Sequence, residues 1–489
     1  MLPIFLFDRL LPWHPQLCII VMYQALSGAR MMRHLQHNSK IIKLYCTGCS
    51  LYFIAAGFAG AFYTGESGTL LADFVRLLSS PSKDATDYFG YGSLGAAYLN
   101  AGLCGLAVIA AVMLLKAEAG ASIMTGYFLV LSHAFYGKNL LNIMPCMLGT
   151  FVALQIRKKK PKELLHICIF SSCFGPLISE LLFRYTLAEF SHGAPSVSAK
   201  AALLAAGCSL AVGLLFPLFM ELSALLTRGY SLYNAGLAGG LLGGLAYLLL
   251  YRLTGRELPG GMEVLNPAYE SAGRSFAAFA NIVFIVFFAV TLLIGRSLNG
   301  GSFKGYGKLL YAKEGVHAER WGMPHCLINI GFYGFFLLAV YDIIIFTGKG
   351  AGFTAPTTGA VIAALSFACT AQSPANTWPV FAGYALFSLL GLLSSGVWLM
   401  ATQPFLSSMA FATGLCPVVQ RRGRVWGVIA GFLCAAICIY PKFIHGGLMI
   451  YNGGFTSGII GCLMMVLFIF LDRLTLQEDE ESRDSGSEQ

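Results

Sequence analysis

Residues 131–149 read LSHAFYGKNLLNIMPCMLG, and residues 365–383 read LSFACTAQSPANTWPVFAG. Aligned without a gap, the two stretches share Leu-Ser-x-Ala and, after seven further residues, Asn-x-x-Pro-x-x-x-Gly. The identical pairs are Leu131/Leu365, Ser132/Ser366, Ala134/Ala368, Asn142/Asn376, Pro145/Pro379 and Gly149/Gly383. In an apolar chain such a match arises either by chance or by internal duplication, and the neighbouring sequence decides between the two.

Two further elements recur in the same order on either side of this stretch. Upstream, YLNAGLCG (98–105) matches LINIGFYG (327–334), and downstream, GYSLYNAGLAGGLLG (229–243) matches GLMIYNGGFTSGIIG (447–461). The downstream pair keeps Tyr-Asn-x-Gly-x-x-x-Gly-x-x-Gly with every spacing intact. Three elements in one order are what gene duplication followed by drift in loop length leaves behind. The sequence therefore predicts two related halves.

The composition places these halves in a membrane. Of the 489 residues, 57% are apolar and only 11% are charged, whereas about 25% of the residues of a soluble protein are charged. Seven apolar segments lie between 44 and 252, and seven lie between 276 and 471. We expect an all-α, multi-pass protein of the lipid bilayer.

The positive charges predict the orientation. Lys and Arg gather in cytoplasmic loops, and the strongly basic loops here are 157–162, 296–320 and 420–424. Placing these inside makes the loops 64–96 and 252–275 external. Each half then has an odd number of crossings, five to seven depending on whether the repeated stretch is a re-entrant or broken helix pair. An odd number inverts one half relative to the other, so the sequence predicts two inverted-topology repeats.

The predicted organisation has five parts. Residues 1–43 form an N-terminal interfacial or tilted segment, 44–252 the first repeat, 253–275 an external linker and 276–472 the second repeat. Residues 473–489 are polar and mostly acidic, which predicts a disordered cytoplasmic tail.

In transporters with inverted repeats, interrupted helices line the solute path where the halves meet. The repeated stretch predicts such an interruption, because each copy contains a proline after a break in the apolar run. We therefore expect the two copies to meet, with Asn142 and Asn376 across a shared cavity. The candidate solute-binding residues are Asn142, Pro145, Asn376, Pro379, Ser132, Ser366, Tyr233, Asn234, Tyr451 and Asn452. The alternative is that Asn142 and Asn376 only cap helices, and that the Asn-x-Gly elements only pack helices together.

Few ionisable residues lie within the apolar segments, namely Glu180, Glu221, Asp342, His133 and Lys138. None is repeated in the other half, so the path is expected to be neutral. We find no nucleotide-binding loop and no hydrolase arrangement of Ser, His and Asp, and Cys46 with Cys49 is a lone CxxC. The sequence thus predicts no enzyme, no cofactor, no metal site and no nucleic-acid partner, while a homo-oligomer is compatible with it.

The Tyr-Asn elements YNAGLAGG (233–240) and YNGGFTSG (451–458) resemble the Tyr-Asn-Gly element of urea transporters. That resemblance implies two inverted halves, each with about five crossings and a re-entrant segment. The urea-transporter pattern of channel-lining prolines and phenylalanines is not reproduced. Over its whole length the chain resembles an uncharacterised bacterial polytopic family with a duplicated domain of unknown function, which implies the bacterial cytoplasmic membrane.

These observations favour a channel or facilitator for a small, mostly uncharged polar solute. The alternative is a secondary transporter coupled to protons or sodium, in which Glu180, Glu221, Asp342 or His133 would be indispensable.

Overall fold

The computed structural model describes residues 15–83, 86–186, 197–258, 260–348, 350 and 352–487. Within these ranges the chain forms helices and no β-strand. Residues 1–14 of the expected N-terminal segment and residues 488–489 of the expected tail lie outside the described part. The all-α class predicted from composition is confirmed.

The first half and the linker contain α1 (Pro15–Tyr63), α2 (Leu70–Leu78), α3 (Tyr88–Tyr91), α4 (Leu94–Leu114), α5 (Ala121–His133), α6 (Leu140–Ile156), α7 (Leu165–Ser171), η1 (Ser172–Phe174), α8 (Gly175–Phe183), α9 (Ala199–Thr227), α10 (Asn234–Tyr247), η2 (Leu248–Arg252) and α11 (Pro267–Ser271). The second half contains α12 (Ala277–Leu298), α13 (Tyr306–Leu310), α14 (His317–Arg320), α15 (Gly322–Gly348), α16 (Ala355–Ala364), α17 (Pro374–Ser395), η3 (Leu399–Ala401), α18 (Gln403–Ala412), η4 (Thr413–Leu415), α19 (Cys416–Arg422), α20 (Arg424–Ile437), α21 (Pro441–His445) and α22 (Asn452–Ser487).

Nine helical spans of the described chain are long and apolar enough to cross a membrane. They lie in α1, α4, α7 to α8, α9, α10 with η2, α12, α15, α17 and α22. The helices α5, α6, α16 and α20 are apolar but shorter. Large apolar side chains such as Leu203, Leu393 and Phe346 are exposed, whereas many Asn, Ser and Thr side chains are buried. This distribution suits a lipid environment, and the molecule is a multi-pass membrane protein.

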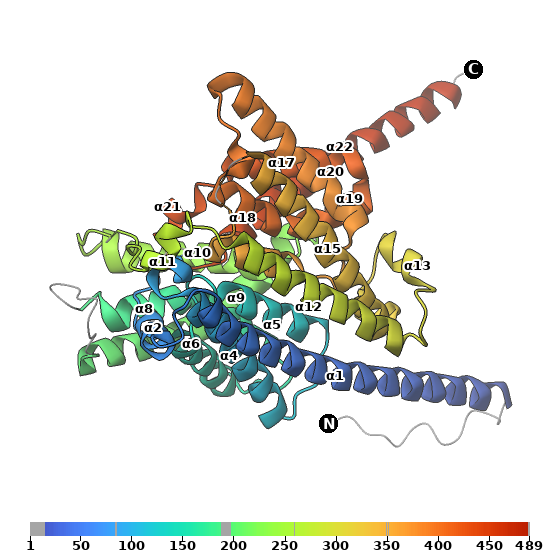
Figure 1. Cartoon of the computed structure of the whole chain (residues 1–489). Helices are drawn as coiled ribbons and strands as arrows, with labels where there is room; N and C mark the ends of the chain where they lie inside the picture. Colours follow the sequence, from blue (N-terminus) through green and yellow to red (C-terminus); the bar gives the residue numbers. More distant parts are fainter. Residues whose placement is uncertain are drawn as a thin grey trace.

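The two halves pack their helices in the same pattern. In the first half α1 packs against α4 and α6 against α9, and in the second half α12 packs against α15 and α17 against α20. In Figure 1 the first-half helices α4, α5, α6 and α9 lie below the second-half helices α15, α17, α18 and α20. The halves touch through α5 with α16 and through α10 with α22.

The matched glycines Gly149 and Gly383 lie at the points where α6 contacts α9 and α17 contacts α20. A Cβ atom on Gly149 would lie 2.4 Å from the carbonyl oxygen of Ser209, and one on Gly383 would lie 2.2 Å from that of Val428. Small residues let membrane helices approach this closely. The last position of the repeated stretch is therefore explained by helix packing alone.

The helices at both ends of the chain extend beyond the predicted repeats. Residues 15–43 of the predicted interfacial or tilted segment are continuous with the first span, because α1 runs without a break from Pro15 to Tyr63. The tail 473–489 was expected to be disordered, but α22 continues to Ser487 and projects from the body in Figure 1. Extending an existing helix avoids the cost of nucleation, and Gln, Glu and Arg are good helix formers.

Candidate functional site

Each copy of the repeated stretch forms a hairpin of two helices joined by a buried turn. The turn between α5 and α6 is capped by Asn142, whose Oδ1 accepts from the Asn139 amide at 2.9 Å while its Nδ2 donates to the Gly137 carbonyl at 2.9 Å. The turn between α16 and α17 is capped identically by Asn376, with 2.9 Å to the Ser373 amide and 2.7 Å to the Ala371 carbonyl. Both asparagines thus use their amides in capping boxes.

In each half, a further asparagine from a neighbouring helix donates hydrogen bonds to the carbonyl groups of the hairpin turn. Asn100 on α4 donates to the carbonyls of Ala134 and Lys138 at 2.7 and 2.9 Å. Asn329 on α15 donates to the carbonyls of Ala368 and Gln372 at 3.0 and 2.8 Å. These carbonyls are at matched positions in the two halves. The Asn-x-Gly elements therefore satisfy buried backbone groups that the hairpin turns leave unpaired.

The prolines are not the point of interruption. Pro145 and Pro379 lie inside the continuous helices α6 and α17. Pro145 is half-buried and Pro379 is buried. The break lies upstream, at the turn that contains Gly137 with its φ of 116°. A proline removes one backbone hydrogen bond, and helix packing on both sides keeps the helix intact.

The two hairpins meet between the halves. The Thr125 hydroxyl on α5 donates to the Ser366 carbonyl after α16 at 2.9 Å. Conversely, a Cβ on Gly359 of α16 would lie 2.3 Å from the Ser132 carbonyl on α5. The hydroxyls of Ser132 and Ser366 are buried and donate to backbone carbonyls three residues earlier, at 3.2 and 2.6 Å. Both serines lie at the contact, but each hydroxyl is hydrogen-bonded within its own hairpin.

The Tyr-Asn elements cross from each half onto the hairpin of the other. Tyr233 packs edge-on against Phe367 with ring centroids 4.8 Å apart, and Tyr451 packs against His133 at 4.8 Å. Phe367 and His133 occupy matched positions. Each Tyr-Asn element therefore packs against the hairpin of the opposite half.

Backbone hydrogen bonds repeat this exchange between the halves. The Leu232 amide donates to the Gly414 carbonyl at 2.9 Å, and the Ile450 amide donates to the Cys173 carbonyl at 3.0 Å. Asn234 differs from Tyr233, because its Oδ1 accepts from Thr227 of its own half at 3.0 Å.

Cys173 and Gly414 belong to a fourth repeated element that our sequence comparison missed. SCFGP (172–176) and TGLCP (413–417) each form a 3₁₀ turn followed by a helix whose second residue is a proline. Aligning the prolines Pro176 and Pro417 would have revealed it.

The chemistry of the two hairpins differs at the positions that face the other half. The amino group of Lys138 is fully buried and donates to the Tyr451 hydroxyl at 2.8 Å. Its counterpart Gln372 is neutral and bonds to the Thr413 hydroxyl at 2.7 Å. The first hairpin thus carries a lysine and a histidine where the second carries a glutamine and a phenylalanine.

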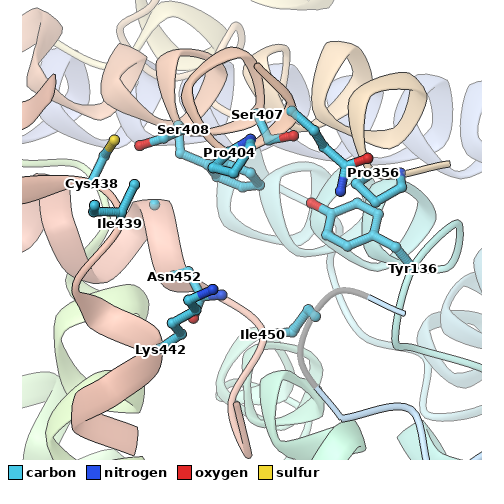
Figure 2. A pocket seen from close by; sticks show the side chains of 13 residues that line it. Tyr136, Pro356, Pro404, Ser407, Ser408, Cys438, Ile439, Lys442, Ile450 and Asn452 are labelled. Atoms are coloured by element: carbon cyan, nitrogen blue, oxygen red, sulfur yellow. The ribbon is translucent and has the colours of Figure 1, made fainter. Parts of the chain in front are cut away.

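A cavity of about 280 Å³ lies beside this contact (Figure 2). Its walls are Tyr136, Pro356, Gln403, Pro404, Ser407, Ser408, Phe411, Cys438, Ile439, Lys442, Ile450, Asn452 and Gly453. Tyr136 comes from the first hairpin turn, and the other residues come from the second half. In Figure 2 the phenol of Tyr136 projects toward the side where Pro404 and Ser407 lie.

The walls of the cavity are almost uncharged. Lys442 is the one charged residue among those that line it. Nearby on α21, burial lowers the pKa of His445 to about 4, so that this imidazole is neutral at neutral pH. The cavity therefore offers hydroxyls, amides and apolar contacts to a small solute.

Of the ten predicted site residues, Asn452 alone lines the cavity. Asn142 and Asn376 were expected to face one, but each caps its own hairpin turn. The cavity residues Tyr136, Gln403, Ser407 and Ser408 were missed, because none is identical at the matched position of the other half.

The other ionisable candidates lie away from the hairpin contact. Glu180 is buried in an ion pair with Arg184 at 2.6 Å and accepts from the Tyr251 hydroxyl at 2.9 Å. Asp342 accepts from Asn281 at 2.9 Å, and Glu221 is exposed. Lys138 and His133 remain as the ionisable residues at the centre. Within the described ranges, no three His, Cys, Asp or Glu side chains are placed to hold a metal ion.

No curated protein and no solved structure is significantly similar to this chain. A family profile matches it twice, over residues 66–252 and 316–469. These ranges correspond to the two halves that the internal repeat predicted, so the duplication is confirmed. The chain belongs to the family described as protein of unknown function (DUF1576), with the family's domain present twice.

Proposed function

We propose that this protein is a multi-pass membrane channel or facilitator for a small, mostly uncharged polar solute. The observation that carries the proposal is the cavity of about 280 Å³, whose polar wall groups are nearly all neutral and which reaches the contact between the two hairpins. Solute paths of transporters with repeats run between the halves, where helices are interrupted. The absence of a reactive constellation in the sequence favours transport over an enzyme.

The proposed architecture is a pair of inverted repeats in the bacterial cytoplasmic membrane. The distribution of basic loops in the sequence predicts it, and the exchange of equivalent contacts between the halves at Tyr233 and Tyr451 supports it. The urea-transporter resemblance of the Tyr-Asn elements points the same way. A homo-oligomer is compatible with this architecture.

The topology is testable by labelling. With a membrane-impermeant maleimide, Ser67→Cys should react in intact cells and Lys159→Cys should react only after lysis, because the basic loop 157–162 is expected to be cytoplasmic. Both positions are exposed, and the cysteines from Cys46 to Cys462 are buried or half-buried. Reaction at 159 but not at 67 in intact cells would reverse the orientation.

The transport proposal is testable with urea in proteoliposomes. Replacing Ser407, which lines the cavity, by tryptophan should reduce urea uptake by about tenfold or more, because the indole fills much of the space that the solute needs. Ser394→Trp is the matched control, since Ser394 is exposed at the end of α17. Equal uptake by wild type, Ser407→Trp and protein-free vesicles would argue against this path.

The second candidate is a secondary transporter coupled to protons or sodium. The buried Lys138 and His133 at the hairpin contact favour it, because ionisable groups persist inside membrane proteins mainly where they bind or move charge. Repeating the uptake assay with and without pH and sodium gradients separates the two candidates.

A further inference from the structure

The amino group of Lys138 is fully buried where the two halves meet, and no carboxylate among the described residues pairs with it. It donates to the Tyr451 hydroxyl at 2.8 Å and approaches the Leu129 carbonyl at 3.5 Å. The titratable groups that face it are His133 on α5, Tyr451 directly before α22, Cys104 on α4, Cys146 on α6 and Cys173 in η1. A buried ammonium without an anion is strongly disfavoured.

The imidazole of His133 adds an unused acceptor beside this lysine. Its Nδ1 lies 2.7 Å from the Leu129 carbonyl, so Nδ1 carries the proton and Nε2 is left as an acceptor. Nε2 is buried and has no hydrogen-bond partner within the described part of the protein. The ring is enclosed by Tyr136, Phe411 and Tyr451 at centroid distances of 5.1, 5.2 and 4.8 Å.

Tyr136 connects this pair to the cavity. Its ring lines the cavity and packs against His133. Its hydroxyl is buried and unpartnered among the residues that the structure describes. Tyr136 and Phe411 thus form the layer between the cavity and the buried pair. A solute that passes this layer meets a phenol donor and a lysine.

We infer that Lys138 binds the negatively charged group of a small solute, a carboxylate or an inorganic oxyanion, and that it takes up one proton when the solute binds. Without the anion the amine is favoured as the neutral form, and with the anion the ammonium becomes stable. The proton comes from the aqueous side and stays on Nζ while the anion is bound. This inference rests on the second candidate function, the proton-coupled transporter, and names the class of solute that it would carry.

The inference agrees with the nearly neutral walls of the cavity. An anion and a proton together carry no net charge, so the path needs no row of fixed charges to carry them. It also agrees with the chemical difference between the two hairpins. The second half keeps the same hairpin with Gln372 and Phe367 in place of Lys138 and His133, and the Gln372 amide donates to Thr413 and accepts from the Phe367 backbone amide.

The second half therefore supplies the test variants. Lys138→Gln and His133→Phe each install the residue that the matched position already holds. In weakly buffered detergent solution at neutral pH, sodium lactate and sodium nitrate are added separately to the purified protein. A pH-indicator dye then reports proton uptake against sodium gluconate as the bulky reference. Wild type should take up protons with lactate or with nitrate, and the arm that responds identifies a carboxylate or an inorganic anion.

Lys138→Gln should lose this proton uptake while its melting temperature stays near that of wild type. His133→Phe should retain it, because Lys138 alone supplies the positive charge that holds the anion. Proton uptake by Lys138→Gln equal to that of wild type, or none by wild type with either anion, would overturn the inference.

Urea uptake separates the inference from the proposed function. If wild-type vesicles carry urea but the protein takes up no protons with either anion, the inference fails and the facilitator stands. If the vesicles carry neither urea nor the anions, the transport proposal itself fails.

Discussion

Gly236→Ala is expected to prevent the two halves from docking and to leave little folded protein in detergent. Gly236 on α10 lies against Gly454 on α22, where an added Cβ would come within 2.4 Å of the Gly454 carbonyl carbon. These glycines occupy matched positions of the Tyr-Asn elements, so the crossing joins equivalent points of the two halves. The obstructing atoms belong to the backbone, so the clash can be removed only by moving one helix. We therefore expect the free energy of unfolding to fall by about 3 kcal/mol or more. Size-exclusion chromatography measures the yield of folded protein, and thermal unfolding measures its stability.

Gly244→Ala on the same helix is the matched control. Its Cβ would find its nearest neighbour at 3.5 Å, an ordinary contact. Since alanine is the better helix former, this variant should be as stable as wild type or slightly more so. Equal yields and melting temperatures for Gly236→Ala and wild type would mean that the α10–α22 crossing is not needed to hold the halves together.

Asn142→Ala and Asn376→Ala are expected to destabilise the protein by similar amounts. Each substitution removes a capping box and leaves buried backbone groups at positions 137 and 139, or 371 and 373, without their side-chain partners. Because each variant loses a cap and leaves buried polar groups unsatisfied, we expect its free energy of unfolding to fall by about 2 kcal/mol. Urea uptake should fall with the folded fraction. Thermal unfolding and uptake are measured on the same preparations.

Asn281→Ala serves as the control for both variants. Asn281 is half-buried on α12 and bonds to Asp342 and to a carbonyl of its own helix, so its loss should cost less. If Asn142→Ala or Asn376→Ala instead kept its melting temperature and lost urea uptake, the amide would contact the solute and capping would not explain its repetition.

The sequence alone was informative about the fold, because residues that both copies of the duplicated element retain appear as identical pairs. The pairs Asn142/Asn376 and Asn100/Asn329 were visible as identities, and the structure shows the same hydrogen bonds around both members of each pair. Helix-forming composition and apolar length predicted the all-α membrane class. The chemical partners of these asparagines were not predictable, because capping and solute binding call for the same amide.

The candidate site was less predictable, since it lies where the halves differ. Tyr136, Ser407 and Ser408 were invisible to a search for identities. In the sequence, Lys138 was visible only as an ionisable residue in an apolar stretch, where burial is energetically unfavourable, and the other half has no matching lysine. Its partner Tyr451 is 313 residues away along the chain.

By itself, the sequence determined that the chain is a duplicated all-α membrane protein, and it located the repeated elements to the residue. Periodicity, apolar length and registered identities are local properties, so they can be read without coordinates. Only the tertiary structure decided that the repeated asparagines cap turns, that the tyrosines contact the opposite half and that Lys138 and His133 lie buried near a cavity with one charged wall residue. Those facts depend on which distant surfaces are packed together, and the free energy of a buried polar group is set by the neighbours that packing provides.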